Sequence, residues 1–129
     1  HDVRIAKLPF QEYIKVLHNS KLSLSPFGMG EICFRDFECM QWGTVIVKPN
    51  MSMVRTKPNI YIEDETYISV KPDWSDLKEK TKKVLGNFKN YSYIVSNLRE
   101  KFKEEYSSNN LCLHWYNIFK NLNNVKETK

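Results

Sequence analysis

Residues 22–49, which read LSLSPFGMGEICFRDFECMQWGTVIVKP, decide the fold of this chain. They open with the short apolar stretch 22–24, continue through a loop that contains Gly28 and Gly30, and end on the β-branched run 45–47 and its polar neighbours. A continuous apolar run of that kind is typical of a strand covered on both faces, as in parallel sheets. The order of strand, loop, helix and strand predicts an α/β sheet with crossover helices.

The middle of this stretch predicts a helix over residues 31–42. Its buried face is expected to carry Cys33, Phe37 and Met40, which recur at helical spacing. Gly43 is expected to end the helix, because glycine readily adopts the left-handed conformation of a helix C-cap.

The flanking segments of the first half predict further short elements. Residues 9–19 have apolar side chains at helical spacing and predict a helix before the first strand. Residues 48–59, with two prolines, predict a long irregular loop. The runs 60–62 and 67–70 predict one or two more strands around an acidic turn.

From residue 73 onward the chain is predicted to be mostly helical. Asp73 or Ser75 can cap a first helix that ends near Leu85, a second is expected over about residues 90–106, and a third over residues 111–122. The side chains expected to face inward on the last helix are Leu111, Trp115, Ile118, Phe119 and Leu122.

Length and composition predict a single domain. Compact domains cluster at roughly 100 to 150 residues, and this chain has 129, of which 41% are hydrophobic and 27% charged. These values exclude a disordered or collagen-like chain. The apolar runs are far shorter than the ~20 residues of a membrane span, so we expect neither a transmembrane helix nor a signal peptide. The tail at 123–129 is expected to fray.

A sheet of three or four strands is thin for a complete doubly wound domain. We therefore expect a Rossmann-like small parallel sheet with a helical C-terminal region, as a truncated half of a larger protein. The chain begins at His1 rather than Met, which favours an excised piece.

The distribution of charge along the chain bears on the class of partner. The formal net charge is +5, and all of the excess lies in residues 66–129. Lysines and glutamates alternate there, as on solvated helix faces, although a basic face that touches anionic lipid or nucleic acid is the other interpretation.

Cys33, Cys39 and Cys112 make an odd count without paired spacing, which favours a reducing compartment such as the cytoplasm. No metal site, cofactor motif or catalytic triad is recognised in the sequence.

The corner between loop and helix is the candidate binding site. A strand that leads through glycines into a helix N-terminus can bind phosphate with free backbone N–H groups, although tight loops also need glycine for steric reasons. Glu31, Arg35 and Glu38 are spaced to share one helix stripe. That stripe is either an exposed salt-bridged face or a site in which Glu38 accepts hydrogen bonds from ribose hydroxyls.

Four segments together, residues 25–38, 42–52, 58–61 and 65–67, resemble a known family. They are similar to the C-terminal, donor-binding domain of glycosyltransferases with the two-Rossmann (B-type) fold, in the bacterial branch that includes spore-coat and surface-polysaccharide enzymes. The similarity covers about residues 8–105.

The resemblance implies a binding role for particular residues. It places the ribose of a nucleotide-sugar on Glu38 and makes Lys48 a further phosphate neighbour. Many retaining members carry two glutamates seven residues apart; here the place of the first is Gly30, with Glu31 one step late, so the stereochemical outcome is not assigned. The residues implied to face the donor diphosphate are Ser25, Phe27, Gly28, Met29, Gly30, Glu31, Ile32 and Arg35.

The resemblance also implies a function for the parent protein. Such enzymes move a sugar from a nucleotide-sugar, which is a substrate rather than a cofactor, to a glycan or related acceptor in cell-surface polysaccharide synthesis. The acceptor binds to an N-terminal domain that precedes residues like these, so we expect this chain to bind donor without turnover, in the cytoplasm and with possible contact at the inner face of the membrane. The alternatives are a non-catalytic nucleotide-binding module and, ranked last, a basic domain that binds membrane or nucleic acid; we expect no nucleic-acid partner.

Overall fold

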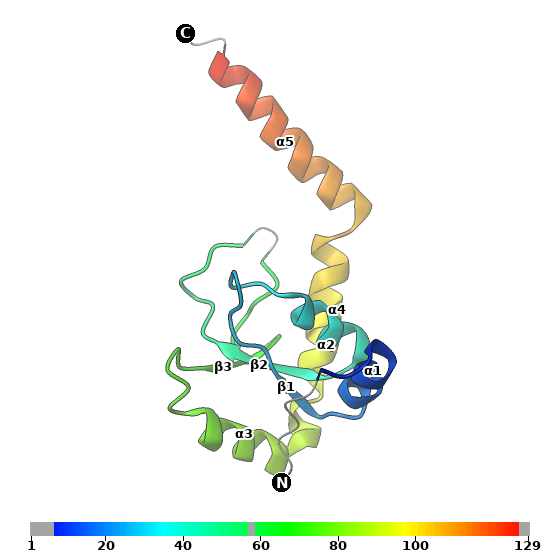
Figure 1. The fold of residues 1–129 in the computed structure, drawn as a ribbon. Helices are drawn as coiled ribbons and strands as arrows, with labels where there is room; N and C mark the ends of the chain where they lie inside the picture. Colours follow the sequence, from blue (N-terminus) through cyan, green and yellow to red (C-terminus); the bar gives the residue numbers. More distant parts are fainter. Residues whose placement is uncertain (1–6, 57–58, 127–129) are drawn as a thin grey trace.

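The structure, a computed structural model, describes residues 7–56 and 59–126, with the backbone alone from residue 123 onward. Its centre is a three-stranded parallel sheet with the strand order β1-β2-β3 (Figure 1). β1 spans Leu22–Leu24, β2 spans Val45–Pro49 and β3 spans Ile68–Val70. In this register Leu22 pairs with Val45, and Val47 with Ile68. The predicted α/β class with a parallel sheet is confirmed.

Helices surround this sheet. α1 (Phe10–His18) precedes β1, and α2 (Phe34–Trp42) connects β1 to β2. A loop connects β2 to β3. The helical second half consists of α3 (Leu77–Gly86), the 3-10 turn η1 (Phe88–Tyr91), α4 (Tyr93–Glu105) and α5 (Ser108–Lys126).

The sheet separates two hydrophobic clusters because alternate side chains of β2 point to opposite faces. Ile46 packs with Leu17 of α1 and Cys39 of α2 on one face. Val45 and Val47 pack on the other face, against the helices of the second half. Every residue of β2 is buried, as predicted for a strand covered on both sides.

α2 begins later than predicted and buries a different face. It starts at Phe34, because Cys33 has an extended backbone (φ −134°, ψ 160°) and its N–H donates to the Asp36 carboxylate over 3.2 Å. Asp36 and Cys39 are its buried residues, whereas Phe37 and Met40 are only partly buried. The spacing of apolar residues does not identify this face, because the burial of Asp36 depends on Lys48 in another element. Gly43 ends the helix in the left-handed conformation (φ 83°), as predicted.

Of the one or two strands predicted from residues 60–62 and 67–70, the structure contains one, β3, and residues 60–62 do not form the second. Ile60 and Tyr61 are buried in the first cluster, but their backbone runs outside the sheet, and only an isolated bridge joins Glu63 to Tyr67. Apolar, β-branched composition predicts burial at these positions and cannot supply a neighbouring strand with free hydrogen-bonding groups.

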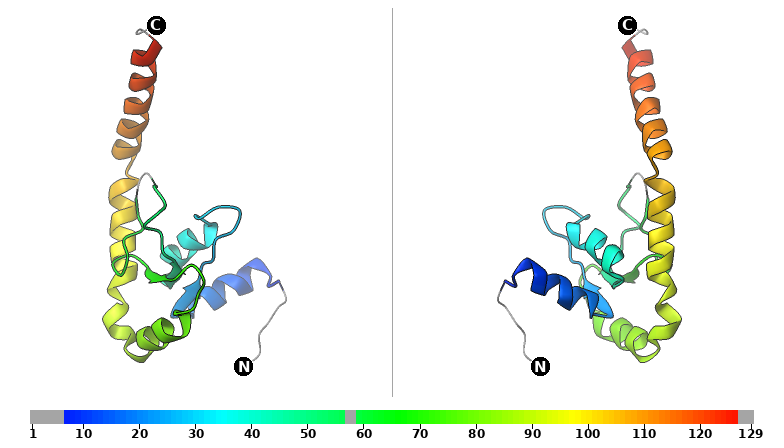
Figure 2. Two further views of the ribbon diagram at one scale, coloured as in Figure 1. Left: turned by 90° about the vertical axis from the view of Figure 1, so that its left-hand side faces the viewer. Right: turned by 90° about the vertical axis from the view of Figure 1, so that its right-hand side faces the viewer.

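α5 projects from the rest of the protein, as all the views show (Figures 1 and 2). The inward face predicted for it is wrong at three of its five residues: Trp115, Phe119 and Leu122 are 54, 60 and 56% exposed. The other two, Leu111 and Ile118, are half-buried. Among the described elements, it contacts α4, the helix that precedes it. Residues 123–126 continue the helix, and the rest of the predicted frayed tail lies outside the described residues. Among the described helices, none combines the length and apolar character needed to cross a membrane.

Candidate functional site

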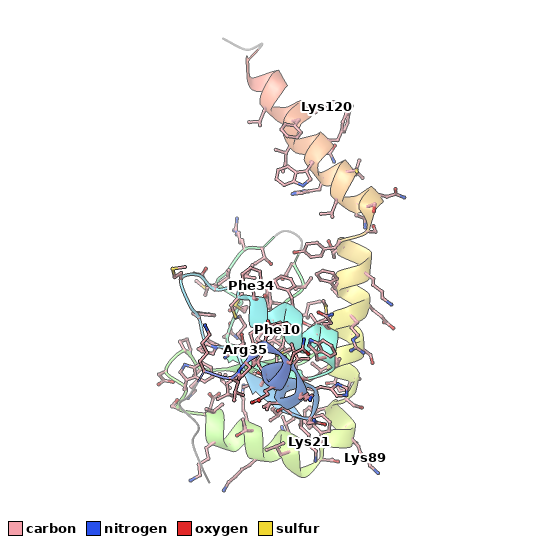
Figure 3. The ribbon with its side chains drawn as sticks, turned by 45° about the vertical axis from the view of Figure 1, so that its right-hand side comes forward. Phe10, Lys21, Phe34, Arg35, Lys89 and Lys120 are labelled. Carbon is pink, nitrogen blue, oxygen red and sulfur yellow. The ribbon has the colours of Figure 1, made fainter. Side chains whose placement is uncertain are left out.

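An open cavity of about 470 Å³ lies where β1 ends, between α1 and the first turns of α2. Figure 3 includes this region, with Phe10 of α1 and Phe34 and Arg35 of α2 labelled. Ligands of open parallel sheets bind beyond the carboxyl ends of the strands, which is where this cavity lies. Its lining residues are Tyr13, Pro26, Phe27, Gly28, Cys33, Phe34, Arg35 and Glu38.

The cavity brings together four residues predicted to bind the donor: Phe27, Gly28, Arg35 and Glu38. Glu38 is half-buried, and its Oε2 accepts a hydrogen bond of 2.6 Å from the hydroxyl of Tyr13. Among the described residues, no hydrogen-bond donor contacts the other oxygen of Glu38. One carboxylate oxygen is therefore held by the protein, and one is open to a ligand hydroxyl.

Tyr13 was not recognised from the sequence as a site residue. Burial raises its pKa, and the hydrogen bond to the Glu38 carboxylate raises it further, so the phenol remains a neutral donor at physiological pH. The available signal was its place on the predicted first helix, but nothing in the local sequence indicates that this helix lies beside Glu38, 25 residues away.

Arg35 is exposed and is anchored at one end. Its Nη1 donates to the carbonyl oxygen of Leu24 over 3.1 Å, which fixes the guanidinium at the end of β1 and leaves other N–H groups for an anion. The predicted stripe of Glu31, Arg35 and Glu38 does not form, because Glu31 precedes the helix. Among the described residues, Arg35 makes no ion pair with either glutamate.

The glycine loop is less constrained than a tight turn. A Cβ atom on Gly28 or Gly30 would meet no heavy atom within 4 Å, and neither residue has a positive φ. The steric explanation for these glycines is therefore not supported by the fold. The N–H of Gly28 donates to the carbonyl of Gly30 over 3.0 Å, so that one group is already used. Of the residues predicted to face the diphosphate, Met29, Gly30, Glu31 and Ile32 are exposed and do not line the cavity.

Two other predicted residues, Ser25 and Lys48, lie beneath the cavity and are fully buried. The Lys48 ammonium lies 3.1 Å from the Asp36 carboxylate, and the Ser25 hydroxyl donates to the same carboxylate over 2.5 Å. Their polar groups are therefore engaged inside the protein.

Asp36 was missed by the sequence analysis although it connects these residues. Besides Ser25 and Lys48, it accepts a hydrogen bond of 2.7 Å from the hydroxyl of Tyr61. Burial and the charge of Asp36 raise the pKa of Tyr61, which therefore stays protonated as a donor. The signal that was available is Lys48 itself, since a lysine within a buried apolar strand requires a partner of opposite charge.

Searches against known protein families, curated proteins and solved structures find no match to this chain. Among the described residues, no group of three or more His, Cys, Asp or Glu side chains could hold a metal ion. The candidate site is thus characterised by its own geometry: a cavity with an open carboxylate, an anchored guanidinium and a helix N-terminus.

Proposed function

We propose that this chain binds a nucleotide-sugar, as the Rossmann-like donor-binding part of a two-domain glycosyltransferase that acts in cell-surface polysaccharide synthesis. The observation that carries the proposal is the cavity at the end of β1, which brings Glu38 and Arg35 together beside the start of α2. The resemblance of the sequence to donor-binding domains of such enzymes supports it independently.

Each wall of the cavity has a chemical role in this proposal. The open oxygen of Glu38 accepts a hydrogen bond from a ribose hydroxyl, and Tyr13 holds the carboxylate in place. Arg35 binds the diphosphate, for which its planar fork of donors is well suited. The helix dipole of α2 adds a partial positive charge at the same end.

The transfer step belongs to the parent enzyme. Stabilisation of the leaving diphosphate by Arg35 and backbone N–H groups provides the electrostatic part of catalysis. A base that activates the acceptor and a surface that binds it would come from the acceptor-binding domain. The isolated chain is therefore expected to bind donor and to turn none over, and measurable transferase activity of the chain alone would contradict this.

The testing experiment is a calorimetric titration of the chain with UDP, GDP, ADP and CMP, followed by the matching nucleotide-sugars. We expect one nucleoside diphosphate to bind selectively. Glu38→Ala should weaken binding by about tenfold or more, the usual effect of losing a hydrogen bond to a charged group. Glu79→Ala, which removes an exposed glutamate of α3, is the matched control and should bind as the unchanged chain does.

Three outcomes would count against the proposal. Failure of the folded chain to bind any of these nucleotides would contradict donor binding by this chain. Equal losses in both variants would exclude a specific role for Glu38. Nucleotide binding that does not distinguish the nucleotide-sugar from the free nucleotide would favour a non-catalytic nucleotide-binding module.

A further inference from the structure

The buried charge cluster beneath the cavity joins four segments of the chain. Asp36, in the first turn of α2, accepts hydrogen bonds from Ser25 at the end of β1 and from Tyr61 in the loop before β3. Lys48 of β2 binds the same carboxylate and also lies 3.4 Å from the carbonyl oxygen of Ser25. Both charged side chains are buried, with at most 1% of their surface exposed.

The cluster is in direct contact with the walls of the cavity. The ammonium of Lys48 lies 5.3 Å from the centre of the Phe27 ring, which lines the cavity and exposes part of its surface. The Cys33 thiol, another wall residue, lies 2.9 Å from the Ser25 hydroxyl and 3.6 Å from Asp36. Arg35 is the direct neighbour of Asp36 on the helix. Three wall residues thus lie against this cluster or directly beside it in the chain.

We infer that Asp36 and Lys48 are positioning residues of the cavity: their buried ion pair holds the loop that carries Phe27 and the start of α2 at the spacing in which a ligand fits. A buried ion pair is a costly way to gain stability, because an apolar pair of similar volume is often at least as stable. What this pair supplies is directional contact between segments that carry the cavity walls. The binding of nucleotide by these walls rests on the proposed function. The role of the ion pair in holding the walls does not.

The three cysteines of the chain provide a test that needs no ligand. Cys33 is half-buried in the cavity wall, Cys39 is buried in the core and Cys112 is exposed on α5. The rate of iodoacetamide modification at each thiol is followed by peptide mass spectrometry. The rate at Cys33 reports exposure of the cavity wall, the rate at Cys39 reports global opening, and the rate at Cys112 reports the activity of the reagent in the same sample.

Lys48→Met is the primary variant. It is expected to increase the modification rate of Cys33 by about tenfold, which corresponds to the loss of one hydrogen bond of typical strength. Cys39 should remain protected. A faster rate at Cys33 together with unchanged rates at Cys39 and Cys112 reports exposure of the cavity wall. Lys101→Met, which breaks the partly exposed ion pairs of Lys101 with Glu104 and Glu105 on α4, is the control and should leave all three rates unchanged.

Two results would overturn the inference. An unchanged Cys33 rate in Lys48→Met would show that the pair does not hold the wall. A parallel rise at Cys33 and Cys39 would show that the pair contributes only to global stability. If Lys48→Met does not fold, the double variant Asp36→Asn, Lys48→Met replaces it, because it leaves no unpaired buried charge. In the double variant Cys39 should be protected and Cys33 should be exposed. An unchanged Cys33 rate, or a parallel rise at Cys33 and Cys39, would overturn the inference there too.

A second arm separates this inference from the proposed function. If the unchanged chain binds a nucleoside diphosphate such as UDP, Lys48→Met should weaken that binding by about tenfold, and an unchanged affinity would contradict the positioning role in ligand binding. If the unchanged chain binds none of the nucleotides while Cys33 responds as expected, the proposed function fails and the positioning role stands.

Discussion

Two buried ionisable residues of α2, Asp36 and Cys39, lie three positions apart and are accommodated in different ways. Asp36 is matched by the Lys48 ammonium and by hydroxyl donors. Cys39 is fully buried in the first hydrophobic cluster, and burial raises the pKa of its thiol from 9.0 to about 11. Its neutral form is therefore the one that fits the folded state.

The buried thiol predicts a pH dependence of stability. Because the folded pKa is raised, the contribution of Cys39 is fully present below pH 9.0 and is lost as the pH rises towards about 11. Between pH 8 and pH 11, the free energy of unfolding should fall by about 2 kcal/mol more in the unchanged chain than in Cys39→Ala. Urea unfolding at a series of pH values measures this difference.

The control for this prediction is Cys112→Ala, because Cys112 is exposed on α5. It should keep the full pH dependence of the unchanged chain. Buried tyrosines with raised pKa values, such as Tyr67, add a decline of the same sign above pH 10 in every variant, which the comparison cancels. Identical pH profiles for the unchanged chain and Cys39→Ala would refute the prediction.

The helix α2 is the element on which both the fold and the candidate site depend. Asp36 caps its start, and Gly43 ends it with a left-handed conformation (φ 83°) that only glycine adopts readily. The N–H of Gly43 donates to the carbonyl of Cys39 over 2.9 Å, and β2 starts two residues later. The direction of the chain from helix to central strand is therefore set at this residue.

Gly43→Ala should lower the free energy of unfolding by about 1 to 2 kcal/mol, the cost of a left-handed conformation for a residue with a Cβ atom. A new Cβ would meet only Arg99 Nη2 at 3.6 Å, an ordinary contact, so backbone conformation is the cause. Gly86→Ala, at the last residue of α3, is the matched control because it has free space and no positive φ. Chemical denaturation of both variants measures the effect, and equal stabilities for the two would contradict this account of Gly43.

At the scale of the whole molecule, the protein consists of a packed part and a projecting helix. α4 belongs to the packed part, since Ile94, Val95 and Leu98 are buried in the two hydrophobic clusters. α5 instead exposes its large apolar side chains and extends away from the sheet (Figure 2). The stability of the sheet should therefore not depend on α5.

Truncation after Ser107 should leave the free energy of unfolding within about 0.5 kcal/mol of the full chain, as for changes remote from the core. Urea unfolding followed by tryptophan fluorescence measures this, because Trp42 and Trp74 remain in the truncated chain. Truncation before Tyr93, which also removes α4, is the comparison and should abolish cooperative unfolding. A large loss of stability on removal of α5 alone would show that α5 is covered in solution and belongs to the folded core.

The local sequence was sufficient for elements whose pattern is complete within one segment. The spacing of apolar residues predicted α1, the run of β-branched residues predicted β2, and Gly43 predicted the end of α2. The helix and the strand depend on the periodicity of apolar residues, and the helix end depends on the conformational freedom of one glycine. Both can be read from a short stretch of sequence. The order of these elements was sufficient to predict a parallel α/β sheet. The resemblance to donor-binding domains pointed to Arg35 and Glu38, and both line the cavity at the end of β1.

Only the tertiary structure decided which polar residues are buried and which apolar residues are not. Asp36 and Lys48 can be buried because each neutralises the charge of the other, although they belong to different elements. The sequence pattern within either element does not indicate this pairing. Residues 60–62 look like a strand, yet strand formation requires a neighbour with free backbone groups. The apolar stripe of α5 looks like a core face, yet burial requires a surface to pack against, which the described parts of the chain do not place there.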